Sequence, residues 1–328
     1  MNNKRWPRAG GQPQAPWADR TGLAQTAAVA SESFAPVSRS GAPLLIENPF
    51  ARGGLAQPKA ASAVRVVTYN IWGLPAWMTG ARSGRYPQIA RELERLNPDL
   101  ILLQEAWTAE ARESAPANGH WAIARAAGQE GFFQQCGLLT LSRLPILGGR
   151  FYPFTRAAFP DSFVNKGVLK VMVQLPAGQV LNVWNVHLQD GGSLDLQQSQ
   201  VRELLHLVLA AENGQVADLV GGDFNCTPGS PCWEELAASL GPSLQQRSGA
   251  PPFVTWDGLS REAGVGRTLD HIFVRARTAV PTLPAAPRVA FAAADRRQRL
   301  SDHLGIEAVL DLDPPANVMA MPAEAAMG

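Results

Sequence analysis

The sequence predicts an α/β protein in which β-sheets pack face to face and helices cover them from the outside. Three observations lead to this fold class. Strand-like apolar segments outnumber helical ones, several of them follow one another without a helix between them, and only two segments show clear amphipathic helical periodicity. A chain that alternated strands and helices would need as many helices as strands, so a sandwich of sheets is the better interpretation.

The predicted strands lie between residues 64 and 310. Val64–Asn70 is rich in β-branched residues, and Leu100–Glu105 begins with a continuous apolar run of the kind found in strands that are buried on both faces. Six more strands are predicted, at Gly137–Ser142, Val168–Val173, Val180–Leu188, Val216–Gly222, Thr268–Val274 and His303–Leu310.

Two segments predict helices. The first spans about Pro87–Leu96 and places Ile89 and Leu93 on one face. The second spans about Leu194–Ala211, where apolar residues recur at helical spacing and the following Asn213–Gly214 provides a stop signal.

The composition divides the chain into a body and two ends. Residues 1–60 are rich in Ala, Gly, Pro, Ser and Gln and predict a disordered or loosely attached arm, in which the apolar patch Leu44–Ile46 could dock on the body. Residues 313–328 predict a disordered tail. With 46% hydrophobic residues in the chain, the body at residues 61–312 can bury a sizeable core, and we expect it to be a monomer.

Charge and cysteine content limit the classes of function and the location. The net charge of +1 gives no overall field that would attract nucleic acid, so no stable nucleic-acid partner is expected. Cys226 and Cys232 could form a disulfide in an oxidising compartment, but free thiols are the favoured interpretation. No membrane span and no standard signal peptide are visible, which favours the cytoplasm. A lipid substrate outside the cell would instead favour export by a non-standard route.

Polar residues that can bind a metal or transfer a proton recur where the predicted strands begin or end. Burying so many carboxylates without partners would cost several kcal/mol, so the pattern predicts mutual hydrogen bonds or a metal ion. The residues are Asn70, Glu105, Asn185, His187, Asp223, Asn225, Asp270, Asp302 and His303.

The segment Val216–Asn225 is the most informative of these. Side chains alternate along a strand, so Asp223 and Asn225 are expected on one face and Phe224 on the other. The two preceding glycines would let backbone or substrate approach closely. An ordinary turn is the alternative interpretation of the same residues.

The residue types favour attack of water on phosphorus. Glu105 is a hard oxygen ligand that suits Mg²⁺, with Mn²⁺ as the alternative, and no Cys/His pattern for structural zinc is present. A metal would polarise a phosphoryl oxygen and stabilise the leaving oxygen. A histidine oriented by a carboxylate could transfer protons, while amides and the second histidine hold the phosphate oxygens.

Five short motifs in the same order resemble those of the endonuclease/exonuclease/phosphatase superfamily, which includes DNase I-like nucleases, inositol phosphatases and neutral sphingomyelinases. The resemblance covers about residues 64–310 and implies a four-layer α/β/β/α sandwich of two mixed sheets, with the catalytic site at one end. The motifs are Thr68–Gly73, Leu103–Glu105, Gly222–Asn225, Leu269–Ile272 and Ser301–His303.

The resemblance also implies a role for each site residue. Glu105 would be the principal Mg²⁺ ligand, with Asn70 beside it and Asp302 near the metal. For the chemistry, His303 would be the general base and Asp270 its orienting carboxylate. The remaining roles are orientation of the attacking water by Asp223 and phosphate binding by Asn225 and His187. Substrate contacts are expected from Asn185, Lys166 and Arg267.

Two segments resemble the sphingomyelinase-like branch of the superfamily. They are Asn165–Leu169, which contains a Lys-Gly-Val sequence, and Val186–Gly192, in which Val186 replaces the usual Thr. His271 stands where Tyr is common, and it either adds a second titratable group beside Asp270 or fills the same space.

These features predict a Mg²⁺-dependent phosphodiesterase that cleaves a phospholipid headgroup of the sphingomyelin type. The apolar loop Leu74–Met78 is a candidate for contact with a membrane surface, and so are the aromatic clusters at Phe132–Phe133 and between Phe151 and Phe163 if they are exposed near the site. A nuclease of the same fold is the alternative and would require Lys and Arg along the cleft. A non-catalytic binding module is a third interpretation, disfavoured by the complete set of acids and histidines.

Overall fold

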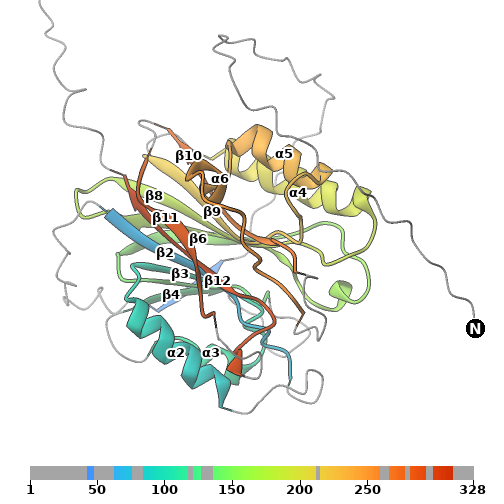
Figure 1. Ribbon diagram of the computed structural model, residues 1–328, viewed down its shortest axis with the longest axis horizontal. Coiled ribbons are helices and arrows are strands. Elements are labelled where there is room, and N and C mark those ends of the chain that lie inside the picture. Colours follow the sequence, from blue (N-terminus) through green and yellow to red (C-terminus); the bar gives the residue numbers. More distant parts are fainter. Residues whose placement is uncertain are drawn as a thin grey trace, which may run out of the picture. The chain divides into compact units, whose positions relative to one another are not determined.

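The computed structural model describes residues 43–47, 63–75, 84–116, 121–126, 136–211, 215–258, 266–277, 281–292 and 298–312. These residues form two mixed β-sheets with helices on their outer faces (Figure 1), which confirms the predicted fold class. The expected tail, the predicted arm outside residues 43–47 and the cluster Phe132–Phe133 lie outside the described residues.

The first sheet contains the strands that carry Asn70 and Glu105. Strands β2 and β3 are parallel, with Asn70 opposite Gln104, and the other neighbours in this sheet are antiparallel. The order across the sheet is β1 (Leu44–Glu47), β4 (Ala122–Ala126), β5 (Leu139–Ser142), β3 (Leu100–Gln104), β2 (Ala63–Asn70), β12 (Gly305–Asp311) and β11 (Thr282–Ala290).

The second sheet carries His187, Asp223 and Asp270. Strands β8 and β9 are parallel, with His187 opposite Asp223, and β10 runs antiparallel to β9 so that Asp270 also lies opposite Asp223. The order across this sheet is β10 (Asp270–Ala276), β9 (Ala217–Asp223), β8 (Val180–His187), β7 (Gly167–Gln174) and β6 (Ile146–Pro153).

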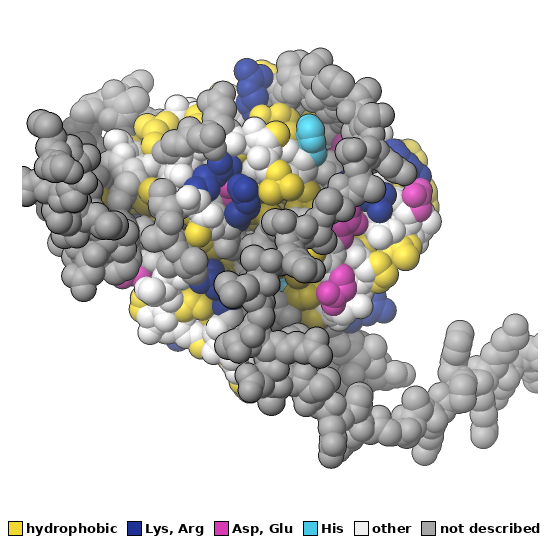
Figure 2. Space-filling model, turned by 90° about the horizontal axis from the view of Figure 1, so that it is seen from above, with side chains coloured by type: hydrophobic (Ala, Val, Ile, Leu, Met, Phe, Trp, Pro, Cys, Tyr) yellow, Lys and Arg dark blue, Asp and Glu magenta, His cyan; other side chains and the backbone are white. Residues whose placement is uncertain are grey.

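Helices cover the outer face of each sheet. On the first sheet lie α2 (Arg85–Leu96) and α3 (Ala109–Arg112), while α4 (Leu194–Leu209) and α5 (Pro231–Leu240) lie on the second (Figure 1). On the face seen from above in Figure 2, hydrophobic side chains occur in small groups among polar and charged ones. Two short helices complete the fold, a 3-10 turn at Asp161–Phe163 and α6 at Leu244–Arg247.

The main core lies between the two sheets. Val66 and Leu102 of the first sheet pack in the same cluster as Leu219 and Ile272 of the second. Separate apolar clusters join α2 to the first sheet and α4 and α5 to the second. Within the described ranges, none of the helices is both long and apolar enough to cross a membrane.

Both predicted helices and all eight predicted strands are present, with ends shifted by a few residues. Leu44–Ile46 pairs with β4 as part of β1, which is the docking that the sequence allowed. The prediction did not include β4, β6, β11 or α5. All three cysteines are buried free thiols.

The two glycines before Asp223 allow close packing of protein against protein. A Cβ on Gly222 would lie 2.0 Å from the carbonyl oxygen of Val186, and one on Gly221 would lie 2.8 Å from Leu102 Cδ1. Gly222 also has a φ of 152°, which side chains rarely adopt. The glycines therefore bring β9 against β8 and against the opposite sheet, rather than against substrate.

We expect Gly222→Ala to lower the free energy of unfolding by about 3 kcal/mol, because the added methyl must displace the Val186 backbone. Urea denaturation measures this change. Gly178→Ala is the control, since Gly178 also has a positive φ, 89°, but no atom lies within 4 Å of its added Cβ. An equal loss in both variants would mean that the φ angle alone, not the close approach, requires glycine.

Candidate active site

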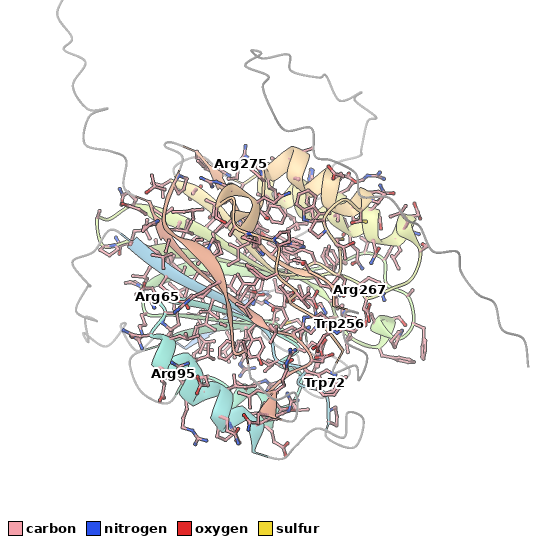
Figure 3. All side chains as sticks on the ribbon, viewed as in Figure 1. Arg65, Trp72, Arg95, Trp256, Arg267 and Arg275 are labelled. Atoms are coloured by element: carbon pink, nitrogen blue, oxygen red, sulfur yellow. The ribbon has the colours of Figure 1, made fainter. Side chains whose placement is uncertain are left out.

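The predicted site residues meet at one end of the sandwich because of how the strands are directed. Parallel strands β2 and β3 end there, with Asn70 as the last residue of β2 and Glu105 directly after β3. Parallel strands β8 and β9 end there with His187 and Asp223. The antiparallel strands β10 and β12 begin at the same end. Figure 3 shows Trp72, Trp256 and Arg267 toward this end, with Arg65 and Arg95 toward the other.

Asn70 links the carboxylates of the two sheets. Its Nδ2 donates to Glu105 Oε1 at 3.0 Å and to Asp223 Oδ2 at 2.9 Å. Its Oδ1 accepts from the Trp72 backbone N–H at 3.0 Å. Asn70 lies beside Glu105 as predicted, but it turns its nitrogen rather than its oxygen toward the acids. It therefore acts as a hydrogen-bond bridge between the two acids in this structure.

The strands stop sharply at two of the site residues. Glu105 follows β3 with a φ of 59°, and Asn225 follows β9 with a φ of 48°. Non-glycine residues in this left-handed region are uncommon, and they concentrate at functional sites. β9 ends at Asp223, and the left-handed backbone at Asn225 interrupts the alternation of side chains. The alternation that predicted a shared face for Asp223 and Asn225 therefore does not extend to Asn225.

His303 and Asp270 form a buried hydrogen-bonded pair. His303 Nδ1 lies 2.9 Å from Asp270 Oδ2, and His303 Nε2 lies 3.6 Å from Asp223 Oδ2. The Asp270 backbone is held by Thr255 Oγ1 and by Gln245. Burial disfavours a charged imidazole, but the carboxylates of Asp270 and Asp223 outweigh it and raise the pKa of His303 to about 10.

His187 lies on the other side of Asp223. Its Nε2 is 3.7 Å from Asp223 Oδ2 and 4.0 Å from Glu105 Oε1. Burial, together with the positive charges of Lys166 and His303, lowers the pKa of His187 well below its usual value. A neutral imidazole follows, which can donate one hydrogen bond without adding charge.

Glu105 and Asp302 carry negative charge that the protein only partly compensates. Burial raises the pKa of Glu105, and the neighbouring charge of Asp302 raises it further. Burial likewise raises the pKa of Asp302, whose Oδ2 accepts from Trp256 Nε1 at 3.3 Å. Hard oxygen donors with surplus negative charge fit a divalent cation such as Mg²⁺.

A second cluster of possible ligand atoms consists of Asp223, Asp270 and His303, whose donor atoms all lie within 4.8 Å of one another. The bond between His303 Nδ1 and Asp270 already accounts for the closest contact in this cluster. This pair is arranged for proton transfer, which leaves the carboxylate oxygens of Glu105 and Asp302 as further candidates to bind a cation.

A cavity of about 320 Å³ opens beside these residues. Asn225 and Arg267 lie in its wall together with hydroxyl, amide and carboxylate groups. Asn225 also donates through Nδ2 to the Leu188 carbonyl at 3.0 Å, which fixes its side chain at the cavity edge. The Arg267 guanidinium stacks on Trp256, with its carbon 5.5 Å from the ring centroid.

Two residues that were predicted to contact substrate, Asn185 and Lys166, are buried. Asn185 has no exposed surface, and its amide accepts from Gln104 Nε2 at 2.8 Å and donates to the carbonyls of Leu103 and Leu139. It ties the two sheets together and does not reach substrate. Lys166 is also buried, and its Nζ pairs with Asp161 at 2.7 Å.

His271 points away from Asp270, into the layer beneath α5. Its Nε2 contacts the Cys226 carbonyl at 3.0 Å, and its ring packs near Phe224 and Trp233 in the cluster beneath α5. Burial lowers its pKa, which favours a neutral ring. Adjacent positions on β10 thus point Asp270 to the site and His271 to the helix layer.

Arg85, which the sequence analysis missed, holds two site segments in place. Its Nη1 donates to the Ile71 carbonyl at 2.6 Å and to the Leu300 carbonyl at 2.8 Å, and its Nη2 donates to the Trp72 carbonyl. These segments follow Asn70 and precede Asp302–His303. Arg85 is the first residue of α2 and lies just before the helix predicted at Pro87–Leu96, and nothing in the local sequence indicates this role.

We expect Arg85→Lys to lower the turnover number about 10- to 100-fold, because one ammonium group cannot satisfy three carbonyls in the geometry of a guanidinium. Steady-state kinetics on the folded protein measures the effect. Arg95→Lys, an exposed change on the same helix at a residue that pairs with Glu92, is the control and should leave turnover unchanged. Wild-type turnover in Arg85→Lys would show that the segments are held without it.

Comparison with known proteins assigns the chain to a family. The family model for the endonuclease/exonuclease/phosphatase family matches residues 67–303. A protein from Drosophila melanogaster with the name "Putative neutral sphingomyelinase" is 26% identical over 274 residues, which are 76% of this chain and 61% of that protein. Inositol phosphosphingolipids phospholipase C from Schizosaccharomyces pombe is 29% identical over 188 residues, 51% of this chain and 42% of that protein. The chain thus spans less than two thirds of either relative.

Solved structures share the fold at low sequence identity. TDP2 from D. rerio, in complex with a single-strand DNA product, superposes with a TM-score of 0.61 at 18% identity and covers 76% of this chain and 99% of that chain. Sphingomyelinase C from Streptomyces griseocarneus gives 0.53 at 19% identity, covering 75% and 99%. A beta toxin variant from Staphylococcus aureus with bound magnesium ions gives 0.54 at 18% identity, covering 75% and 98%. With a family match across most of its length, the chain belongs to the endonuclease/exonuclease/phosphatase family.

Proposed function

We propose that this protein is a phosphodiesterase that hydrolyses a phospholipid of the sphingomyelin type, by attack of water on phosphorus. The observation that carries the proposal is the His303–Asp270 pair, which lies next to Asp223 at an end of the sandwich where Asn70 and Glu105 also meet. Both relatives named above act on sphingolipids according to their names.

Each residue has a defined task in this proposal. His303 takes a proton from the attacking water at Nε2, while Asp270 holds the proton on Nδ1. Asp223 orients the water, and the neutral His187 and the amide of Asn225 donate to phosphate oxygens. As the water oxygen bonds to phosphorus, the bond from phosphorus to the leaving alkoxide breaks. The alkoxide takes a proton from solvent, and His303 releases the proton it accepted to solvent.

A Mg²⁺ or Mn²⁺ ion held by Glu105, with Asp302 close by, would polarise a phosphoryl oxygen and neutralise the leaving oxygen. His303 can accept a proton only when it is neutral, and its raised pKa of about 10 keeps it protonated near pH 7. A metal ion beside Glu105 and Asp302 would add positive charge and so lower the pKa of His303. The site is therefore suited to an enzyme that works with the metal bound.

A nuclease of the same fold is the second candidate. Arg267, in the cavity wall beside Asn225, favours it, because a guanidinium there could contact a nucleic-acid phosphate. The structural neighbour with a bound DNA product shares the fold.

The test is a substrate panel of sphingomyelin vesicles, phosphatidylinositol phosphate vesicles and plasmid DNA, each with Mg²⁺ and with EDTA. We expect cleavage of sphingomyelin that EDTA abolishes. Brisk DNA cleavage without lipid turnover would favour the nuclease, and equal rates in EDTA would exclude the metal. Asp223→Ala should remove the activity; if it does not, Asp223 does not orient the water.

A further inference from the structure

The loop between β6 and β7 exposes two aromatic side chains that touch each other. Phe159 is 78% exposed and Phe163 is 56% exposed, and their rings meet edge to face with centroids 5.9 Å apart. In the part of the chain that the structure describes, no other phenylalanine, tyrosine or tryptophan side chain is exposed to this degree. Single exposed apolar residues are common, but a pair of exposed aromatic rings on one surface loop indicates a contact with a binding partner.

Polar contacts tie the base of this loop to the active site. Asp161 Oδ2 accepts from Lys166 Nζ at 2.7 Å and from the Asp190 backbone N–H at 3.0 Å. Lys166 Nζ also donates to the Leu188 carbonyl at 3.1 Å, and the Ala158 backbone N–H donates to Gln189 Oε1 at 3.0 Å. The anchored segment 188–190 directly follows His187, so the two rings have a fixed position relative to the site.

The start of α4 adds an apolar residue on the same rim. Leu194 is 48% exposed and lines the cavity beside Asn225. Arg156, on the β6–β7 loop, pairs with Asp195 at 2.8 Å and joins the loop to the start of this helix. Leu194 and Asp190 line the cavity, and Asp161 contacts Asp190, so the loop that carries Phe159 and Phe163 is anchored next to the cavity.

We propose that Phe159, Phe163 and Leu194 form a membrane-contact surface that holds the cavity against the headgroups of a lipid bilayer. The inference rests on the proposed lipid substrate and adds where the protein would touch the membrane. Aromatic rings partition well into the boundary between headgroups and acyl chains. Three side chains are too few for a stable protein interface, which needs about 800 Å² from each partner, but they suffice for reversible attachment to a bilayer.

The test separates membrane binding from chemistry. Binding of the double variant Phe159→Ala, Phe163→Ala is measured by co-sedimentation with phosphatidylcholine–sphingomyelin vesicles, in an Asp223→Ala background so that the vesicles remain intact. Turnover is measured without that background, on the same vesicles and on bis(p-nitrophenyl) phosphate, a soluble diester. We expect vesicle binding and vesicle turnover to fall about tenfold or more, with turnover of the soluble diester unchanged.

Leu147→Ala, Leu209→Ala is the matched control, because both leucines are exposed but lie on β6 and at the end of α4. It should bind vesicles as the wild type does. Unchanged binding in the phenylalanine variant would overturn the membrane surface while leaving the proposed function intact. An equal loss on the soluble diester would also overturn it, since the loop would then act on the chemistry. If the wild type binds vesicles through these rings but cleaves no lipid, the surface stands and the proposed substrate is wrong.

Discussion

Replacing Asp270 with Asn is expected to lower the turnover number about 1000- to 10,000-fold, with a smaller change in KM. Asp270 accepts the Nδ1 proton of His303, and this bond leaves Nε2 free to take a proton from water. An amide at position 270 can present its N–H to Nδ1 and stabilise the wrong tautomer. Single-turnover kinetics with saturating substrate measures the chemical step directly.

Asp218→Asn is the matched control for this change. Asp218 is also a fully buried carboxylate, on β9, but it pairs with Arg277 at 2.8 Å and lies toward the other end of the strand. We expect this control to lose about 3 kcal/mol of stability while its folded fraction keeps wild-type turnover. If Asp270→Asn also keeps its turnover, His303 is not the general base.

Glu105→Gln should have opposite effects on activity and on stability. We expect turnover to fall about 100-fold or more and the Mg²⁺ concentration for half-maximal activity to rise about tenfold, since a neutral amide is a weaker ligand. Without metal, the variant should unfold at a higher temperature than the wild type. Burial and the charge of Asp302 raise the pKa of Glu105, which means that the folded state disfavours its ionised form.

Glu307→Gln distinguishes this effect from a general effect of removing a buried acid. Glu307 is buried on β12, but it pairs with Arg65 at 3.0 Å and with Arg288 at 2.7 Å. Loss of a compensated charge should destabilise the protein. Thermal unfolding of both variants in EDTA gives the comparison. Unchanged Mg²⁺ dependence in Glu105→Gln would exclude Glu105 as the principal ligand and direct attention to Asp223, Asp270 and His303.

The strands that build the site could be predicted because each is an apolar run with a polar residue at its end. The missed strands lack such a pattern for physical reasons. β6 contains Gly148 and Gly149 and lies at the edge of its sheet, while β11 contains Pro284 and Pro287, also at an edge. Edge strands tolerate these residues because they need fewer backbone hydrogen bonds. The signal for α5 was present, since Ser230 caps it and Pro231 begins it.

Sequence periodicity gave the face of each site residue but not its depth. Asn185 and His187 share one face of β8, yet only His187 reaches the end of the sandwich, because Gln104 and Leu139 of the other sheet enclose Asn185. The task of Arg85 depends on a contact with Leu300, 215 positions away in the sequence, and no local pattern can reveal it. The residues that were misassigned or missed are therefore those whose roles depend on long-range packing.

The hydrogen bond between His303 and Asp270 joins residues that belong to different sheets. His303 stands just before β12 of the first sheet, and Asp270 begins β10 of the second. In the proposed mechanism, proton transfer therefore depends on the position of one sheet relative to the other. A sliding motion of about 1 Å between them would be enough to misalign the base. Volume changes at Leu102 or Leu219, deep in the core, should therefore tune the rate of catalysis as well as the stability of the fold.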